Sequence, residues 1–177
     1  MSGDTETLAT WDEPGLIAAG LGPPHRLDGL EPAHVPREPG VYVILRLQSD
    51  GKVAFRDVGS AGRFRDRAPN VDVEQLAASW VDGIDVLYVG KANDLRQRIG
   101  LLRHFGQGEP GARWGGRYIW QLEDAAGLRA AWRSMAARCN VAQRAALIDA
   151  FVEQHGTRPF GNRQAPACSA RAEEERR

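Results

Sequence analysis

Short runs of apolar and β-branched residues, separated by turn-forming residues, recur along this chain and predict β-strands. Four of these runs predict strands over residues 41–47, 52–58, 86–89 and 128–133. Ser49, Asp50 and Gly51 form a turn signal between the first two runs, which favours a hairpin there. In the last run apolar and polar residues alternate, so this strand is expected to be half buried.

Helical patterns occupy the segments around these strands. Apolar residues at 95, 99 and 102 recur at the spacing of one helix face, which predicts a helix from Asn93 or Asp94 to about Phe105. Further helices are predicted over residues 11–21, 72–80 and 140–154. The segment 115–123 is compatible with helix or strand, and we favour a helix. The inward side of the helix over 140–154 is expected to hold Ile148, Phe151, Val152 and His155.

The chain has 177 residues, which is enough for one domain with a hydrophobic core. Residues 1–38 are rich in Pro and Gly and, beyond the short helix, predict an irregular and acidic N-terminal segment. Residues 164–177 end in a run of charged residues and predict a disordered tail. The folded domain is therefore expected over residues 39–163.

The sequence does not predict a membrane protein, and its formal net charge at pH 7 is zero. No run has the apolar length of a membrane span, and the N-terminus lacks the pattern of a signal peptide, so a cytoplasmic protein is expected. Cys139 and Cys168 lack metal-type spacing, and a structural disulfide between them is not expected. Residues 1–40 carry seven acidic and two basic side chains, whereas residues 91–118 carry six basic and two acidic ones. A local positive region of this kind can attract a polyanion.

Two tripeptides place a tyrosine beside a glycine in strand-like runs, namely Gly40-Val41-Tyr42 and Tyr88-Val89-Gly90. If the two strands pair, both phenols can lie on the same side of the sheet. Arg98 borders the apolar face of the next helix, so its guanidinium can emerge beside that sheet. Cleavage of a phosphodiester needs an activated water and positive charge against the phosphate oxygens. Tyr42 is a candidate to position or deprotonate the water, and Arg98 is a candidate to bind the phosphate.

These residues and their order resemble the GIY-YIG nuclease superfamily. The matching positions are Gly40-Val41-Tyr42, Tyr88-Val89-Gly90-Lys91-Ala92, Leu95-x-x-Arg98, His104 and Asn162. The resemblance implies an α/β domain with a small three-stranded antiparallel sheet flanked by helices. Residues 48–84 would then be an inserted hairpin and helix. The resemblance also implies cleavage of DNA that depends on a divalent metal, Mg²⁺ or Mn²⁺.

The resemblance assigns roles to individual residues. Tyr42, Tyr88, Arg98 and His104 would be the catalytic residues, with Tyr42 as the base or water-positioning group and Arg98 as the stabiliser of the transition state. The residues expected to contact the substrate are Lys91, Arg96, Arg144 and Asn162. DNA is the expected partner, a protein partner for targeting is possible, and no membrane partner is expected.

The chain departs from the family pattern at three points. The insertion separates the two tyrosine motifs, and His104 falls later after Arg98 than the family pattern places it. The helix position expected to supply the metal-binding glutamate, three residues before Leu147-Ile148, holds Arg144.

Two hypotheses follow from the third departure. In the first, the protein is a metal-dependent endonuclease whose metal ligand is relocated to Asp149 or Glu153. In the second, it is a domain that has lost its metal ligand and binds nucleic acid or a protein partner without cutting. Arg144 would repel Mg²⁺ in its position and could itself grip a phosphate.

Overall fold

The structure is a computed structural model and describes residues 8–64, 66–111 and 116–163. Within these residues it is an α/β fold whose four strands form one antiparallel sheet in the order β1-β4-β2-β3. The strands are β1 (His25–Arg26), β2 (Gly40–Leu45), β3 (Val86–Ala92) and β4 (Arg129–Ser134). The α-helices are α1 (Glu13–Ala18), α2 (Val73–Ser79), α3 (Leu95–Gly106) and α4 (Ala137–His155). Short 3-10 helices are η1 (Pro32–His34), η2 (Gln48–Asp50), η3 (Arg117–Gln121) and η4 (Ala125–Gly127).

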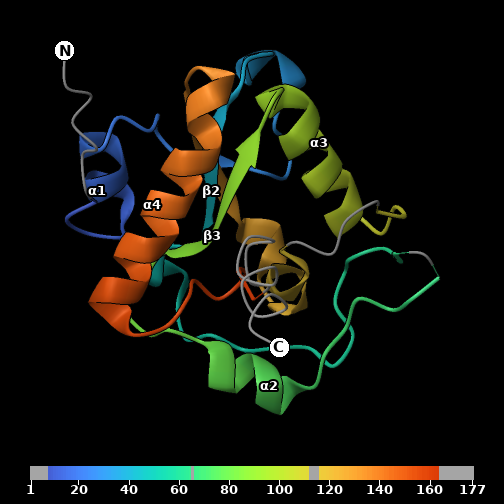
Figure 1. Cartoon of the computed structure of the whole chain (residues 1–177). Helices are drawn as coiled ribbons and strands as arrows, with labels where there is room; N and C mark the ends of the chain where they lie inside the picture. Colours follow the sequence, from blue (N-terminus) through green and yellow to red (C-terminus); the bar gives the residue numbers. More distant parts are fainter. Residues whose placement is uncertain (1–7, 65, 112–115, 164–177) are drawn as a thin grey trace, which may run out of the picture.

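The sheet has a hydrophobic core on each face, and Figure 1 shows the strands between α3 and α4. One face carries Tyr42 and Tyr88 and packs against the apolar side of α3. The other face carries Val43 and Val89 and packs against α4 and α1. Because successive side chains of a strand point to opposite faces, β2 and β3 supply both cores.

The predicted helices are largely confirmed. α3 begins where the sequence indicates, because the Oδ1 atom of Asp94 accepts a hydrogen bond from the backbone N–H of Gln97 at 2.9 Å. α1 and α2 are shorter than the predicted helices over 11–21 and 72–80. The segment over 115–123 contains η3, so the preference for a helix there is confirmed as a 3-10 helix.

The predicted hairpin between residues 41–47 and 52–58 is wrong. Both edges of β2 are already occupied, by β3 on one side and β4 on the other. At Gly51 the backbone adopts φ of 92°, a conformation that suits glycine, and the chain leaves the sheet. Residues 52–58 run beside η3 instead, where Phe55 forms a bridge with Leu122. The insertion is therefore a loop followed by α2, not an inserted hairpin.

The sheet has one strand more than the three that were expected. β1 comes from the N-terminal segment and pairs with β4 through His25↔Ala130 and Arg26↔Arg129. With only two residues, this strand carries no alternation that a sequence pattern can detect. The same N-terminal segment buries Leu16 in the core beside α4.

α4 differs from its prediction at its start and on one side. It begins at Ala137, so Asn140 lies inside the helix, where its Nδ2 atom donates to the carbonyl oxygen of Ala92 at 2.7 Å. Ile148 and Phe151 are buried as expected, but Val152 is 36% exposed because it lies about 100° around the helix from Phe151.

Two further predictions concern the C-terminal tail and membrane-spanning segments. The predicted tail over 164–177, with Cys168, lies outside the described residues. Among the residues that are described, no helix combines the length and the apolar character needed to cross a membrane.

Candidate functional site

The pairing of β2 with β3 brings the two tyrosine motifs together. Tyr42 lies opposite Gly90, and the rings of Tyr42 and Tyr88 are 6.0 Å apart between centroids and inclined by 46°. Arg98 reaches the same place from α3, and its Nε atom donates a hydrogen bond to the Tyr42 hydroxyl at 3.1 Å. The expected placement of both phenols and this guanidinium on one side of the sheet is confirmed. We call these three residues the tyrosine–arginine cluster.

The glycine of each motif provides space for a neighbour. A Cβ atom at Gly90 would overlap the ring and hydroxyl of Tyr42, so the phenol lies directly across the backbone of β3. A Cβ atom at Gly40 would overlap the carbonyl oxygen of Arg133 on β4. The two tripeptides are therefore packing motifs as well as candidate chemistry.

The tyrosine–arginine cluster is enclosed, which determines its protonation. Tyr42 is 0% exposed and Tyr88 is 5% exposed. Burial raises the pKa of Tyr42 above its ordinary value, Tyr88 raises it further, and the guanidinium of Arg98 opposes these effects only in part. Burial also opposes the charge of Arg98, but the two phenols outweigh it and raise the pKa of Arg98. The cluster therefore holds a neutral phenol and a charged guanidinium near neutral pH.

Two predicted substrate-binding residues, Asn162 and Arg144, hold the free edge of β3. The Nδ2 atom of Asn162 donates to the carbonyl oxygen of Val89 at 2.9 Å, and its Oδ1 atom accepts from the Val89 N–H at 2.8 Å. The Nε atom of Arg144 donates to the same Val89 oxygen at 3.2 Å. These contacts satisfy backbone groups that an edge strand would otherwise expose. Both side chains therefore have a structural role, which is to satisfy the backbone of β3 at Val89.

The remaining predicted residues lie apart from the tyrosine–arginine cluster or are bonded elsewhere. The side chain of His104 is 44% exposed, and its Nδ1 atom lies 3.4 Å from the Oε2 atom of Glu109. The Nε atom of Arg96 donates to the carbonyl oxygen of Val35 at 2.7 Å. Lys91 is the exposed residue of β3. The structure therefore brings Tyr42, Tyr88 and Arg98 together but does not add the other predicted residues to them.

The residues that are present do not fit the divalent metal that the resemblance implies. Arg144 stands at the expected ligand position with its guanidinium on Val89. Asp149 and Glu153 are exposed on α4, which covers the sheet face opposite to Tyr42. Within the described part of the chain, no group of three or more His, Cys, Asp or Glu side chains is placed to hold a metal ion.

Gln121 is a buried polar residue that the sequence analysis did not identify, and it is 1% exposed. Its Nε2 atom donates to the carbonyl oxygens of Arg56, Asp57 and Val71 at 3.0, 3.3 and 2.8 Å. Its Oε1 atom accepts from the Val71 N–H at 2.8 Å. This single amide fastens the loop of the insertion to η3. No sequence signal marks it, because its partners are backbone groups that every residue type provides.

Known proteins offer no match to this chain: no family model, no curated protein and no solved structure matches it. The resemblance to the GIY-YIG superfamily therefore stays a prediction that rests on this chain's own features. These are two tyrosine motifs on adjacent antiparallel strands and an arginine from the following helix that contacts the first tyrosine. They support a proposal about function, which the position of Arg144 modifies.

Proposed function

We propose that this chain is a DNA-binding protein of the GIY-YIG type that holds DNA without the metal-dependent cleavage implied by the family resemblance. One observation carries the proposal. Arg144 occupies the helix position of the expected metal-binding glutamate, and its Nε atom donates to the carbonyl oxygen of Val89 at 3.2 Å. A guanidinium held at this place repels a divalent cation, so the chain's own residues oppose metal binding there.

The state of Tyr42 supports the same conclusion. A general base must be unprotonated at the working pH and must reach the proton that it removes. Burial raises the pKa of Tyr42, and its side chain is 0% exposed. Its hydroxyl oxygen accepts a hydrogen bond from Arg98. These properties suit a phenol that fixes α3 against the sheet, and they do not suit one that activates water.

The DNA-binding part of the proposal is supported by exposed positive charge at the start of α3. A hollow of about 320 Å³ there is lined by Arg37, Asp94, Arg96 and Gln97. Lys91 is exposed just before this helix. Among the described residues, neither Lys91 nor Arg37 forms an ion pair with a carboxylate. Such unpaired cations contact phosphates and release counterions from DNA.

Titration of a fluorescent DNA duplex at several salt concentrations tests this proposal. Lys91→Gln and Arg37→Gln should each weaken binding several-fold and lower the slope of log affinity against log salt by about 1. Lys52→Gln is the matched control, because Lys52 is exposed and follows the end of β2 that is farther from Lys91, and it should leave both quantities unchanged. Absence of binding at low salt, or equal losses in all three variants, would contradict the proposal.

A second candidate function is the metal-dependent endonuclease itself. The observation that favours it is the preserved contact between Arg98 and Tyr42 at 3.1 Å, which places the two principal residues of the family pattern together. The two candidates differ in whether the phosphodiester is cut, and they share the expectation that DNA binds.

A further inference from the structure

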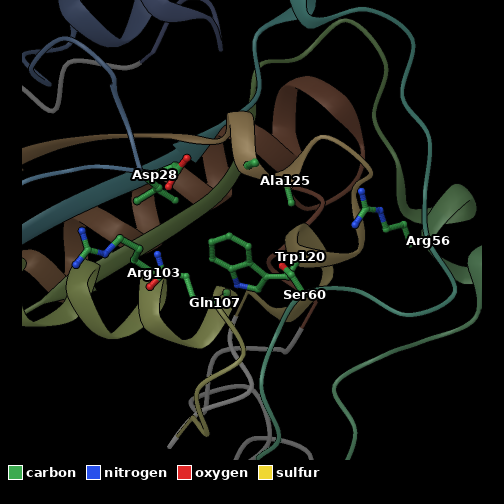
Figure 2. A pocket seen from close by; sticks show the side chains of 10 residues that line it. Asp28, Arg56, Ser60, Arg103, Gln107, Trp120 and Ala125 are labelled. Atoms are coloured by element: carbon green, nitrogen blue, oxygen red, sulfur yellow. The ribbon is translucent and has the colours of Figure 1, made fainter.

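The insertion and α3 enclose a pocket that the proposed function does not use. Its volume is about 240 Å³, and Trp120 of η3 lies among its lining residues, so we call it the Trp120 pocket. Figure 2 shows the indole with Arg103 and Gln107 of α3 on one side and Ser60 and Arg56 of the insertion on the other. The GIY-YIG resemblance does not cover the insertion, so one wall of this pocket lies outside that resemblance.

Trp120 is held rigidly and carries an unsatisfied donor. Its indole is 5% exposed and packs so closely on α3 that a Cβ atom at Gly106 would overlap its six-membered ring. Its carbonyl oxygen accepts from the N–H of Ser60 at 3.0 Å. Among the described residues, the buried Nε1 atom of the indole has no hydrogen-bond acceptor. Because this atom is inaccessible even to water, the indole offers an occupant of the pocket an apolar wall and not a hydrogen bond.

Two charged residues of the lining, Arg56 and Asp28, lie on opposite sides of the indole. Arg56 is exposed, and its Nη2 atom donates to the carbonyl oxygen of Glu123 at 3.0 Å. Among the described residues Arg56 forms no ion pair, so its other N–H groups can bind a phosphate. Asp28 lies on the other side of the indole from Arg56 (Figure 2). Its carboxylate can accept from an exocyclic amino group, as carboxylates do from bases.

We infer that the Trp120 pocket receives one nucleotide, with its base against the indole and its phosphate at Arg56. The volume of about 240 Å³ limits the occupant to a group of the size of one base, with the sugar and phosphate outside at exposed Arg56. A base packs its flat apolar face on the indole and, in adenine or cytosine, supplies an amino group for Asp28. If the nucleotide belongs to DNA, this inference rests on the DNA binding proposed above. Its base must then leave the base stack of the duplex to enter the pocket.

The test compares two fluorescent duplexes that differ by one extra unpaired adenosine. The wild-type protein should bind the bulged duplex about tenfold more tightly than the paired duplex. Ala126→Trp should abolish this preference but keep the affinity for the paired duplex, because Ala126 is exposed and lines the pocket, so a large side chain there fills it. Arg56→Gln should reduce the preference, whereas Arg138→Gln, a change at an exposed residue of α4 outside the pocket lining, should leave it intact.

A separate titration with free deoxyadenosine monophosphate distinguishes the two sources of a nucleotide. If DNA does not bind, the proposed function fails, but binding of the mononucleotide that Ala126→Trp abolishes would still support the pocket. If wild-type protein binds both duplexes equally, or if Ala126→Trp keeps the preference, the pocket proposal is overturned while the DNA-binding proposal stands. Absence of binding to either duplex and to the mononucleotide overturns both proposals.

Discussion

Replacement of Gly90 by alanine should destabilise the fold by about 3 kcal/mol, because the new methyl group overlaps the ring of Tyr42. The ring cannot move aside easily. Tyr42 is 0% exposed, and the centroid of its ring lies 6.0 Å from that of Tyr88. Its hydroxyl also accepts a hydrogen bond from Arg98. For a chain of this size, a loss of that magnitude lowers the unfolding midpoint by about 6–12 °C.

Gly100→Ala is the matched control for this change. Gly100 lies within α3, and a Cβ atom there would meet nothing within 4 Å. The substitution should stabilise the protein by about 0.5–1 kcal/mol, since alanine is the better helix former. Urea unfolding followed by circular dichroism measures both changes. A neutral Gly90→Ala variant would show that the phenol of Tyr42 does not lie across β3 as described.

The second large effect is a loss of stability at alkaline pH that depends on Tyr42. The unfolded chain ionises this phenol at its ordinary value of 10.0, whereas burial raises the pKa of Tyr42 in the folded chain. The stabilisation from the raised pKa is complete below pH 10.0 and is lost as the pH rises towards the folded value. Over that interval, the free energy of unfolding should fall by about 1.4 kcal/mol for each pH unit.

The contribution of Tyr42 is isolated by comparison with Tyr42→Phe, which removes the ionisable group and keeps the ring. The difference in unfolding free energy between wild type and variant should be constant up to about pH 10 and should then decrease in favour of the variant. A difference that stays constant throughout the alkaline range would mean that Tyr42 ionises at the same pH in both states. It would also remove the argument that burial raises the pKa of Tyr42 in the folded protein.

The parts of the fold that were predictable are those with strong local signals. The strand around Tyr42 is an apolar run that is buried throughout, the strand around Tyr88 is buried except at Lys91, and α3 has both a capping aspartate and an apolar face. The prediction of a hairpin was wrong because a turn signal does not reveal that distant strands occupy both edges of β2. β1 could not be predicted, because two residues that pair with β4 have no pattern of their own.

In the candidate site too, features that follow from short sequence motifs were predictable, and features that depend on tertiary packing were not. The two motifs predict that both phenols share one side of the sheet if their strands pair, and the helix pattern predicts Arg98 beside that side. The register of β2 and β3 and the hydrogen bond between Arg98 and Tyr42 come from the structure. The tasks of Asn162 and Arg144 were not predictable, because both bind a backbone group of Val89. The side of the sheet that α4 covers also depends on tertiary packing, and it separates Asp149 from the tyrosine–arginine cluster.

The central claim is that this chain binds DNA but does not cut it, and incubation with supercoiled plasmid in Mg²⁺ or Mn²⁺ tests it most directly. The assay should use protein concentrations at which binding is established by the duplex titration. We predict that wild-type protein leaves the plasmid supercoiled and that Arg98→Ala behaves identically. Nicking by wild type that Arg98→Ala abolishes would contradict the claim and establish the endonuclease instead.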